Sequence, residues 1–190
     1  MARPGAHAPV RAFLFGTGCI VTISVRDARS SPADRAWIAQ VFREYLDDLL
    51  PLNTGRFPVL GEIGHREPDQ LARWFDDPNS FPLLIIKSSE PVGFAMVTRS
   101  PGAAARPGTE YRMGEFFIAR QHRGLGCGRG AVQLILDRFA GRWEIVEYQR
   151  NPGAVKFWRQ VVAGYTGGRY QERIVNDEVR QYFESGVRGR

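Results

Sequence analysis

Four glycines at alternating positions, Gly124, Gly126, Gly128 and Gly130, lie between an apolar segment and a run of residues with helical spacing. Glycines let the main chain approach a ligand closely because they carry no Cβ. The N–H groups in the first turn of a helix lack acceptors within it, and the helix dipole adds partial positive charge there. The stretch therefore predicts an anion site, for which a diphosphate is the natural ligand. The alternative is a glycine-rich turn that binds nothing.

Two common phosphate loops fit this stretch poorly. A Walker A loop requires Gly-Lys-Ser/Thr, whereas Arg129 follows Gly128. The dinucleotide-binding pattern G-x-G-x-x-A can be written over 126–131, with Glu147 about 20 residues further on. That pattern should follow an apolar strand directly, but the polar residues 120–123 intervene. The remaining chain is also too short for a doubly wound domain.

The glycine loop also fits a longer motif, and a second motif follows it after a stretch long enough for one helix and one strand. The pattern Arg/Gln-x-x-Gly-x-Gly/Ala matches 123–128. The pattern Asn-x-x-Ala-x-x-Phe-Tyr matches 151–158, except that tryptophan stands at the last position. With these motifs the chain resembles the GNAT superfamily of acyl-CoA-dependent N-acetyltransferases. The resemblance is most specific over 111–165 and extends over 20–98 in element order alone.

The resemblance implies a site for acyl-CoA in a wedge between the fourth and fifth strands of the domain, which splay apart. Main-chain N–H groups of the glycine loop would hold the pyrophosphate, and the end of the fourth strand would pair with the pantetheine arm. That strand would also orient the thioester carbonyl, which gains negative charge as an amine attacks. The implied cofactor-binding residues are Phe117, Ile118, Ala119, Arg123, Gly124, Leu125, Gly126, Cys127, Gly128, Arg129, Asn151 and Phe157.

Transfer to an amine requires a base, because the ammonium group must lose a proton before it can attack. Glu115, on the fourth strand, is the candidate base, and a solvent-facing or salt-bridged carboxylate is the alternative interpretation. In this family the tyrosine after the motif phenylalanine often protonates the leaving thiolate, but Trp158 has no hydroxyl. Tyr165 is the candidate catalytic acid in its place, although the chain after Phe157 is longer than the family pattern. A thiol with a pKa of about 8.5 can also leave without an acid.

Two other residues near the loop have reactive side chains. A helix N-terminus lowers the pKa of a thiol, which would suit Cys127 as a nucleophile, but a small residue between two glycines is the simpler interpretation. His122 is interpreted as a surface residue of the approach loop. The 3 histidines and 2 cysteines of the chain are too dispersed for a metal site, so no metal is expected.

The pattern of apolar residues predicts the elements that position these groups. The β-branched run 20–25 predicts a strand, and Ser31, Pro32 and Asp34 predict the start of a helix that ends near residue 51. Further strands are predicted at 83–86, 91–98, 111–119 and 143–148, with helices around 71–75, 131–139 and 154–162, and a final pair of strands, or a strand and tail, over 170–183. The sum is an α/β fold in which a mixed, mostly antiparallel sheet is flanked by about four helices.

Length and composition indicate one domain. With 190 residues, 43% hydrophobic and 12% aromatic, the chain can bury one core and is not disordered. No run approaches the roughly 20 apolar residues of a membrane-spanning helix, and the N-terminal segment matches a signal peptide poorly. We expect a flexible N-terminal extension over 1–19, a GNAT-like domain over 20–185 and a tail over 186–190, in a cytoplasmic protein.

The net charge of +6 favours anionic partners, but the basic residues are scattered and form no basic arm. The resemblance implies an enzyme that moves an acetyl or short acyl group from acetyl-CoA or another acyl-CoA to a primary amine by direct attack in a ternary complex. The acceptor is a small molecule or peptide, with its choice set by 53–67 and 100–108. A non-catalytic acyl-CoA-binding regulatory module and a nucleic-acid-binding protein are the alternatives. Membrane and nucleic-acid partners are not expected, and a homodimer is left open.

Overall fold

The computed structural model of the chain describes residues 10–15, 19–52, 67–99 and 105–186. Within these ranges an eight-stranded sheet runs in the order β1-β2-β3-β4-β5-β6-β8-β7. The strands are β1 (Val10–Phe15), β2 (Cys19–Asp27), β3 (Ser80–Lys87), β4 (Glu90–Arg99), β5 (Tyr111–Ile118), β6 (Gly141–Tyr148), β7 (Gln171–Val175) and β8 (Glu178–Ser185). The helices are α1 (Pro32–Leu49), α3 (Glu67–Asp76), α4 (Cys127–Arg138) and α5 (Pro152–Thr166). Neighbouring strands are antiparallel except β5 and β6, so the predicted mixed sheet with flanking helices is confirmed.

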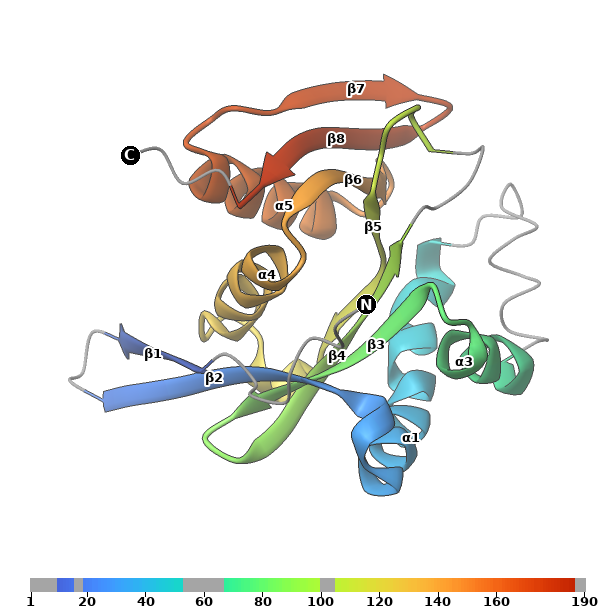
Figure 1. The fold of residues 1–190 in the computed structure, drawn as a ribbon, viewed down its shortest axis with the longest axis vertical. Coiled ribbons are helices and arrows are strands. Elements are labelled where there is room, and N and C mark those ends of the chain that lie inside the picture. The colour runs from blue at the N-terminus through green and yellow to red at the C-terminus, as the bar shows by residue number, and fades with distance from the viewer. Residues whose placement is uncertain (1–9, 16–18, 53–66, 100–104, 187–190) are drawn as a thin grey trace.

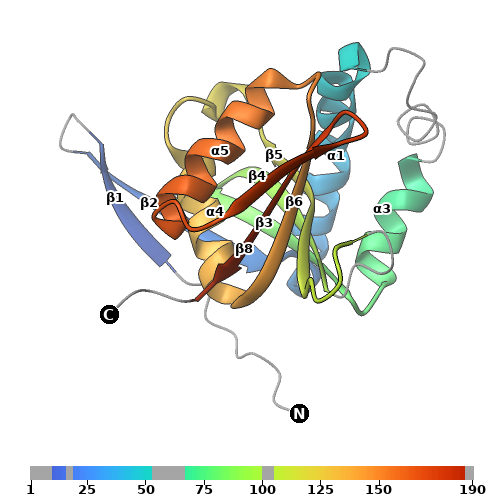
Figure 2. The ribbon, with the colours of Figure 1, turned by 90° about the horizontal axis from the view of Figure 1, so that it is seen from above.

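The sheet is covered on both faces. Helices α1 and α3 lie against one face, and α4 and α5 against the other (Figures 1 and 2). Leu84 and Ile86 of β3 belong to the core under α1, whereas Leu83 and Ile85 belong to the core under α4. A strand buried on both faces needs apolar residues at successive positions, and this explains the unbroken run in β3.

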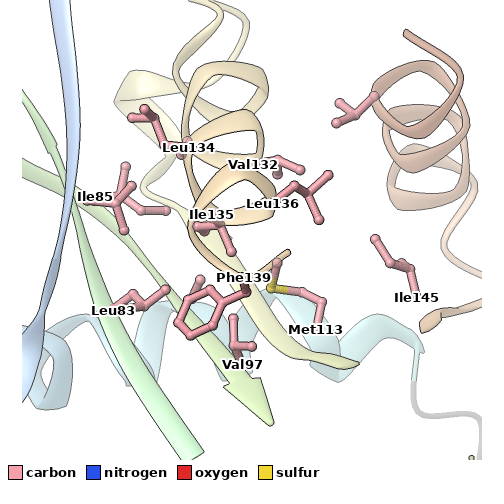
Figure 3. Close-up of a cluster of buried hydrophobic side chains, with 14 of the residues drawn as sticks. Leu83, Ile85, Val97, Met113, Val132, Leu134, Ile135, Leu136, Phe139 and Ile145 are labelled. Atoms are coloured by element: carbon pink, nitrogen blue, oxygen red, sulfur yellow. The ribbon is translucent and has the colours of Figure 1, made fainter. Parts of the chain in front are cut away.

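Helix α4 lies between the two halves of the sheet. Figure 3 shows its side chains, including Leu134 and Ile135, between Leu83 of β3 and Ile145 of β6. These residues are at most 1% exposed. The apolar side chains of α4 therefore join residues of β3 and β6 in one core on this face of the sheet. No helix in the described ranges is long and apolar enough to span a bilayer.

Two tight turns close the hairpins of the sheet. Ser88 and Ser89 both have positive φ between β3 and β4, and Asn176 and Asp177 do so between β7 and β8. Turns with two positive φ values suit the twist of antiparallel strands. The first turn joins the strands predicted at 83–86 and 91–98. The second resolves the C-terminal alternatives in favour of a final pair of strands.

The N-terminal boundary of the folded part differs from the expected one. Strand β1 covers part of the predicted extension 1–19 and pairs antiparallel with β2, from Val10 opposite Ser24 to Phe15 opposite Cys19. The edge of β2 offers unpaired main-chain groups, and a preceding segment can satisfy them by pairing. Residues 1–9 and 187–190 lie outside the described part of the chain.

One arginine fixes the end of α3 to the sheet. Arg29, in the turn after β2, donates through Nε and both Nη atoms to four carbonyl oxygens. The acceptors are Trp74 at 3.0 Å, Phe75 at 2.8 Å, Asp77 at 2.8 Å and Ser80 at 2.7 Å. Carbonyls at a helix C-terminus lack partners within the helix, so this guanidinium group satisfies them and holds α3 in place.

We predict that Arg29→Met lowers the free energy of unfolding by about 1–2 kcal/mol, because it leaves several carbonyls without their donor. Urea unfolding measures the change. Arg43→Met is the matched control, because Arg43 is an exposed arginine on α1, and it should change stability by less than about 0.5 kcal/mol. Equal stability of the two variants would contradict the role of Arg29.

Candidate functional site

The parallel pairing of β5 and β6 is short. It covers three residue pairs, which end at Met113 opposite Ile145. Beyond them β5 continues along β4 to Ile118, and β6 continues along β8 to Tyr148. The two strands therefore splay, as the resemblance implied for the fourth and fifth strands of the domain. A cleft of about 1450 Å³ opens there, between α1 and α3 on one side and the start of α4 and α5 on the other.

A buried ion cluster lies where the pairing ends. Glu144 of β6 is 0% exposed and accepts from Arg112 of β5 and, at 3.2 Å, from Arg180 of β8. A carboxylate removed from water requires such partners, and two guanidinium groups supply them. The cluster joins three strands at the closed end of the cleft. It therefore fixes the point from which β5 and β6 diverge.

A β-bulge determines where Glu115 points. The register between β4 and β5 shifts by one residue at Gly114. Side chains alternate along a strand, so the extra residue moves Glu115 to the face opposite Met113. Met113 packs in the core under α4, whereas the Glu115 carboxylate accepts a hydrogen bond from Tyr45 Oη on α1. A Cβ at Gly114 would overlap the ring of Trp74, so glycine is required for this packing.

A second carboxyl group, Glu147 of β6, lines the same cleft. By alternation it lies on the face of Trp143 and Ile145, which pack in the core under α4. Trp158 of α5 also lines the cleft and lowers the pKa of the Glu147 carboxyl, because its indole N–H is a donor that favours the ionised form. Sequence analysis placed Glu147 only in a rejected dinucleotide pattern. A glutamate on the apolar face of a strand was the signal that could have identified it.

The two carboxyl groups have raised pKa values for related reasons. Burial raises the pKa of Glu115 to about 7, against the lowering effect of the Tyr45 hydrogen bond. Burial, with the nearby Glu115 carboxylate, raises the pKa of Glu147 to about 8, against the lowering effect of Trp158. Burial and Glu115 also raise the pKa of the Tyr45 hydroxyl. Near neutral pH the cleft therefore holds one carboxyl that readily accepts a proton and one that readily gives it.

The glycine loop presents main-chain donors at the edge of the cleft. Gly124 and Gly126 have φ of 74° and 75°, a conformation that favours glycine, and Gly126 precedes α4 without any side-chain cap. The N–H of Arg123 donates to Arg120, and that of Gly130 donates to Gly126. The N–H groups of 124–129, which lie between these two donors in the sequence, have no acceptor within the described ranges. The loop therefore has the uncapped donors that an anion site requires.

The side chain of Arg123 connects the glycine loop to β5 and α1. Its Nε donates to the Ile118 carbonyl at 2.7 Å, and its Nη2 binds Asp48 of α1. Arg120 binds the same carboxylate at 2.6 Å. Partial burial raises the pKa of Asp48, but hydrogen bonds and charge from these two arginines outweigh that effect and hold the pKa below its usual value. Arg123 thus ties the loop to α1 and does not extend into the space in front of the loop N–H groups.

The predicted cofactor-binding groups at the end of β5 already have partners. The Ile118 carbonyl accepts from Arg123, and the Ala119 N–H donates to the carbonyl of Val92 at 2.9 Å. Asn151 caps α5, because its Oδ1 accepts from the Ala154 N–H at 3.0 Å. A ligand that pairs with this end of β5 could therefore not use the Ala119 N–H, whereas the Ile118 oxygen keeps a second lone pair.

Most, but not all, of the predicted site residues meet at the cleft. Those that line it are Glu115, Phe117, Ile118, Arg123, Gly124, Gly126, Gly128, Arg129, Asn151 and Phe157. Four predicted residues do not line it, namely Ala119, Leu125, Cys127 and Tyr165. His122, interpreted from the sequence as a surface residue, lines the cleft with a side chain only 11% exposed.

The side chains of Cys127 and Tyr165 both lie away from the cleft. This agrees with the interpretation of Cys127 as a small residue between two glycines, and it does not favour Tyr165 as the catalytic acid. Cys127 is 1% exposed in the core under α4, and burial raises the pKa of its thiol, which opposes a nucleophilic role. Tyr165 Oη donates to Asp137 of α4 at 2.9 Å. Tyr165 follows Trp158 by two helical turns, about 10 Å along α5, so it lies beyond the cleft.

The comparisons with known proteins agree with this geometry. A sequence model of the acetyltransferase (GNAT) family matches residues 39–164, more than half of the chain. No curated protein matches the chain. An acetyltransferase from Thermus thermophilus is 19% identical, with 84% of this chain and 96% of that one covered at a TM-score of 0.59. A GNAT-family acetyltransferase from Streptococcus agalactiae is 14% identical, with coverages of 93% and 100% and a TM-score of 0.63.

A third similar structure was solved with ligands. It is the spermidine N-acetyltransferase from Vibrio cholerae in complex with CoA and spermine. It is 13% identical, with 86% of this chain and 95% of that one covered at a TM-score of 0.56. At such identities the likeness of the structures concerns the fold alone.

The two partly buried carboxyls should make stability depend on pH. A carboxyl with a raised pKa in the folded state stabilises that state while it is protonated, and this contribution is lost as the pH rises through the folded pKa. We therefore predict that Glu147→Gln gains stability relative to the wild type by about 1–3 kcal/mol between pH 5 and pH 9. Denaturant unfolding at both pH values measures the difference.

Glu172→Gln is the control of opposite sign. Arg159 lowers the pKa of Glu172, although partial burial opposes the shift, so its charged form stabilises the fold at neutral pH. This variant should lose stability relative to the wild type as the pH rises from about 3 to 6. A pH-independent difference between Glu147→Gln and the wild type would contradict the raised pKa of Glu147.

Proposed function

Because the chain belongs to the GNAT acetyltransferase family, we propose that it transfers an acetyl or short acyl group from acyl-CoA to a primary amine. The amine attacks the thioester directly, in a ternary complex within the cleft between β5 and β6. The single observation that carries this proposal is that the glycine loop, through Gly124, Gly126, Gly128 and Arg129, borders the same cleft as the Glu115 carboxyl. Such a transfer requires a binding site for the CoA diphosphate and a base for the amine within one cavity.

The residues of the loop suit a CoA diphosphate. Uncapped N–H groups and the N-terminus of α4 supply donors and partial positive charge, and the side chain of Arg129 also lines the cleft. A Cβ at Gly128 would approach the ring of Phe157 at 3.2 Å, so a larger residue there would require the ring to shift slightly. Phe157 in turn stacks on Phe116, which leaves an apolar wall beside the loop. We propose that this wall borders the pantetheine arm.

Glu115 is the proposed base. Its pKa of about 7 allows it to be ionised near neutral pH and still to accept a proton readily. Tyr45 hydrogen-bonds its carboxyl, and Trp74 covers the adjacent Gly114. These aromatic side chains line the α1 side of the cleft and suit the apolar part of an amine. A small-molecule or peptide amine is therefore the proposed acceptor.

One alternative function has a specific observation behind it. Trp158 stands where the family motif has a tyrosine, and an indole cannot give its proton to a thiolate. A protein with this replacement can bind acyl-CoA without turning it over, as a regulatory module would. The assay of thiol release separates this alternative from the enzyme.

We predict that the protein releases free CoA thiol from acetyl-CoA when a primary amine is present. A panel of polyamines, amino acids, amino sugars and peptides is tested with a thiol reagent, and mass spectrometry identifies the acetylated product. A regulatory module would bind acetyl-CoA in calorimetry and yet release no thiol with any amine.

We also predict that Gly126→Glu weakens binding of CoA at least tenfold, because the new carboxylate lies beside the proposed diphosphate site. Gly126 has φ of 75°, so any side chain is strained there. Gly126→Ala is therefore the matched control, since it carries the same strain without the charge. Calorimetric titration with CoA compares them, and equal affinities would contradict the loop as the diphosphate site.

A further inference from the structure

The cleft contains one carboxyl group that the proposed function leaves without a role. Glu115 and Glu147 come from the two splayed strands and act on each other electrostatically. Their neighbours lie on opposite sides of the cleft. Glu115 accepts a hydrogen bond from Tyr45 of α1, whereas Glu147 lines the cleft with Trp158 of α5, which lowers its pKa. The glycine loop lies at the start of α4, on the α5 side. Glu147 therefore lies toward the proposed CoA, and Glu115 toward the proposed acceptor.

We propose that Glu147 is the catalytic acid that protonates the departing CoA thiolate, and that Trp158 is the positioning residue that orients its carboxyl. This inference rests on the proposed function, because it assigns the second proton transfer of the same reaction. It gives Trp158 a role in catalysis without a hydroxyl of its own. It also explains why a glutamate stands on a strand face whose other residues, Trp143 and Ile145, are buried and apolar.

The proton balance of the reaction requires both carboxyls. The ammonium group of the acceptor gives a proton to ionised Glu115, and the neutral nitrogen forms a C–N bond with the thioester carbon. As the tetrahedral intermediate collapses, the C–S bond breaks and its electron pair goes to sulfur, which takes the proton of Glu147. The amide nitrogen loses its remaining extra proton, which restores Glu147, and Glu115 releases its proton to solvent. One acceptor ammonium and one acetyl-CoA thus give an amide, CoA thiol and one proton.

The surroundings of Glu147 keep it protonated. Glu115 faces it from β5 and Trp158 from α5, while Tyr148 on its own strand and Tyr45 on α1 are near enough for their pKa values to respond to it. Its partner on β8 is Val179, which is apolar and 3% exposed. None of these neighbours is a cation. Trp158 is the one group among them that favours the ionised form of Glu147. The Glu147 carboxyl therefore keeps its proton near neutral pH but can still donate it to a thiolate.

Two carboxyls with different environments can divide acid and base roles. Glu115 must be ionised and Glu147 protonated, so activity should rise as the pH passes about 7 and fall as it passes about 8. The fall follows because Glu147 loses the proton that it must give. If Glu147 served only to anchor Trp158, its loss of a proton would not make kcat fall at high pH.

The test compares Glu147→Gln with Glu115→Gln, using acetyl-CoA and hydroxylamine, an amine that is already neutral at pH 7. Glutamine keeps an acceptor for Trp158 but has no acidic proton. We expect Glu147→Gln to lower kcat about 100-fold with KM for acetyl-CoA within threefold, and to abolish the basic limb near pH 8. Glu115→Gln should lose much less with hydroxylamine than with the best ordinary amine, because a neutral nucleophile needs no base.

Two Trp158 variants give independent readouts. Trp158→Phe removes the donor that favours the ionised carboxylate, so the basic limb should move to higher pH. Trp158→Tyr combined with Glu147→Gln places a hydroxyl beside the lost acid and should restore kcat at least tenfold. Unfolding curves and CoA affinities like those of the wild type establish that each variant is folded.

The outcomes separate this inference from the function on which it rests. An active wild type with Glu147→Gln within threefold of its kcat overturns the role of Glu147 and leaves the acyltransferase intact. A lower kcat with an unchanged basic limb also overturns it, because it indicates an anchor for Trp158. A wild type that binds CoA but releases no thiol with hydroxylamine or any panel amine overturns both proposals.

Discussion

The early end of pairing between β5 and β6 is the constraint on which the rest of the structure depends. Parallel neighbours normally share a ladder along their length, but here each strand has another partner to follow, β4 on one side and β8 on the other. The Arg112–Glu144–Arg180 cluster joins the strands at the last paired residues. Because α4 packs on one face of both halves, the core on that face stays buried although the strands splay.

The splay and the bulge together place two carboxyls in one cleft. Gly114 shifts the alternation of β5, so Glu115 reaches Tyr45 on α1. Glu147, on the diverging strand, reaches Trp158 on α5. Burying two carboxyls so close together costs free energy, and their raised pKa values express that cost. Such a cost is common where a site needs groups that exchange protons near neutral pH.

Helix α1 connects the two ends of the cleft. Tyr45 binds the proposed base, and Asp48, one turn further along the same face, binds Arg120 and Arg123, which precede the loop. A shift of α1 would therefore move both the base and the loop. Arg29 holds the end of α3, whose Trp74 covers Gly114, so the bulge is supported from a second helix.

Spacing between residues close together in the chain was enough to predict most helices and strands, their order, the glycine loop and the family. The sequence also identified Glu115 by type, since few carboxyls lie on that strand. The additional strand β1, the turn of Glu115 toward α1, the Glu147–Trp158 pair and the removal of Tyr165 from the cleft were decided by the tertiary structure alone. Each depends on a partner strand or helix far away in sequence, and a shift of one residue in register reverses the face on which a side chain lies.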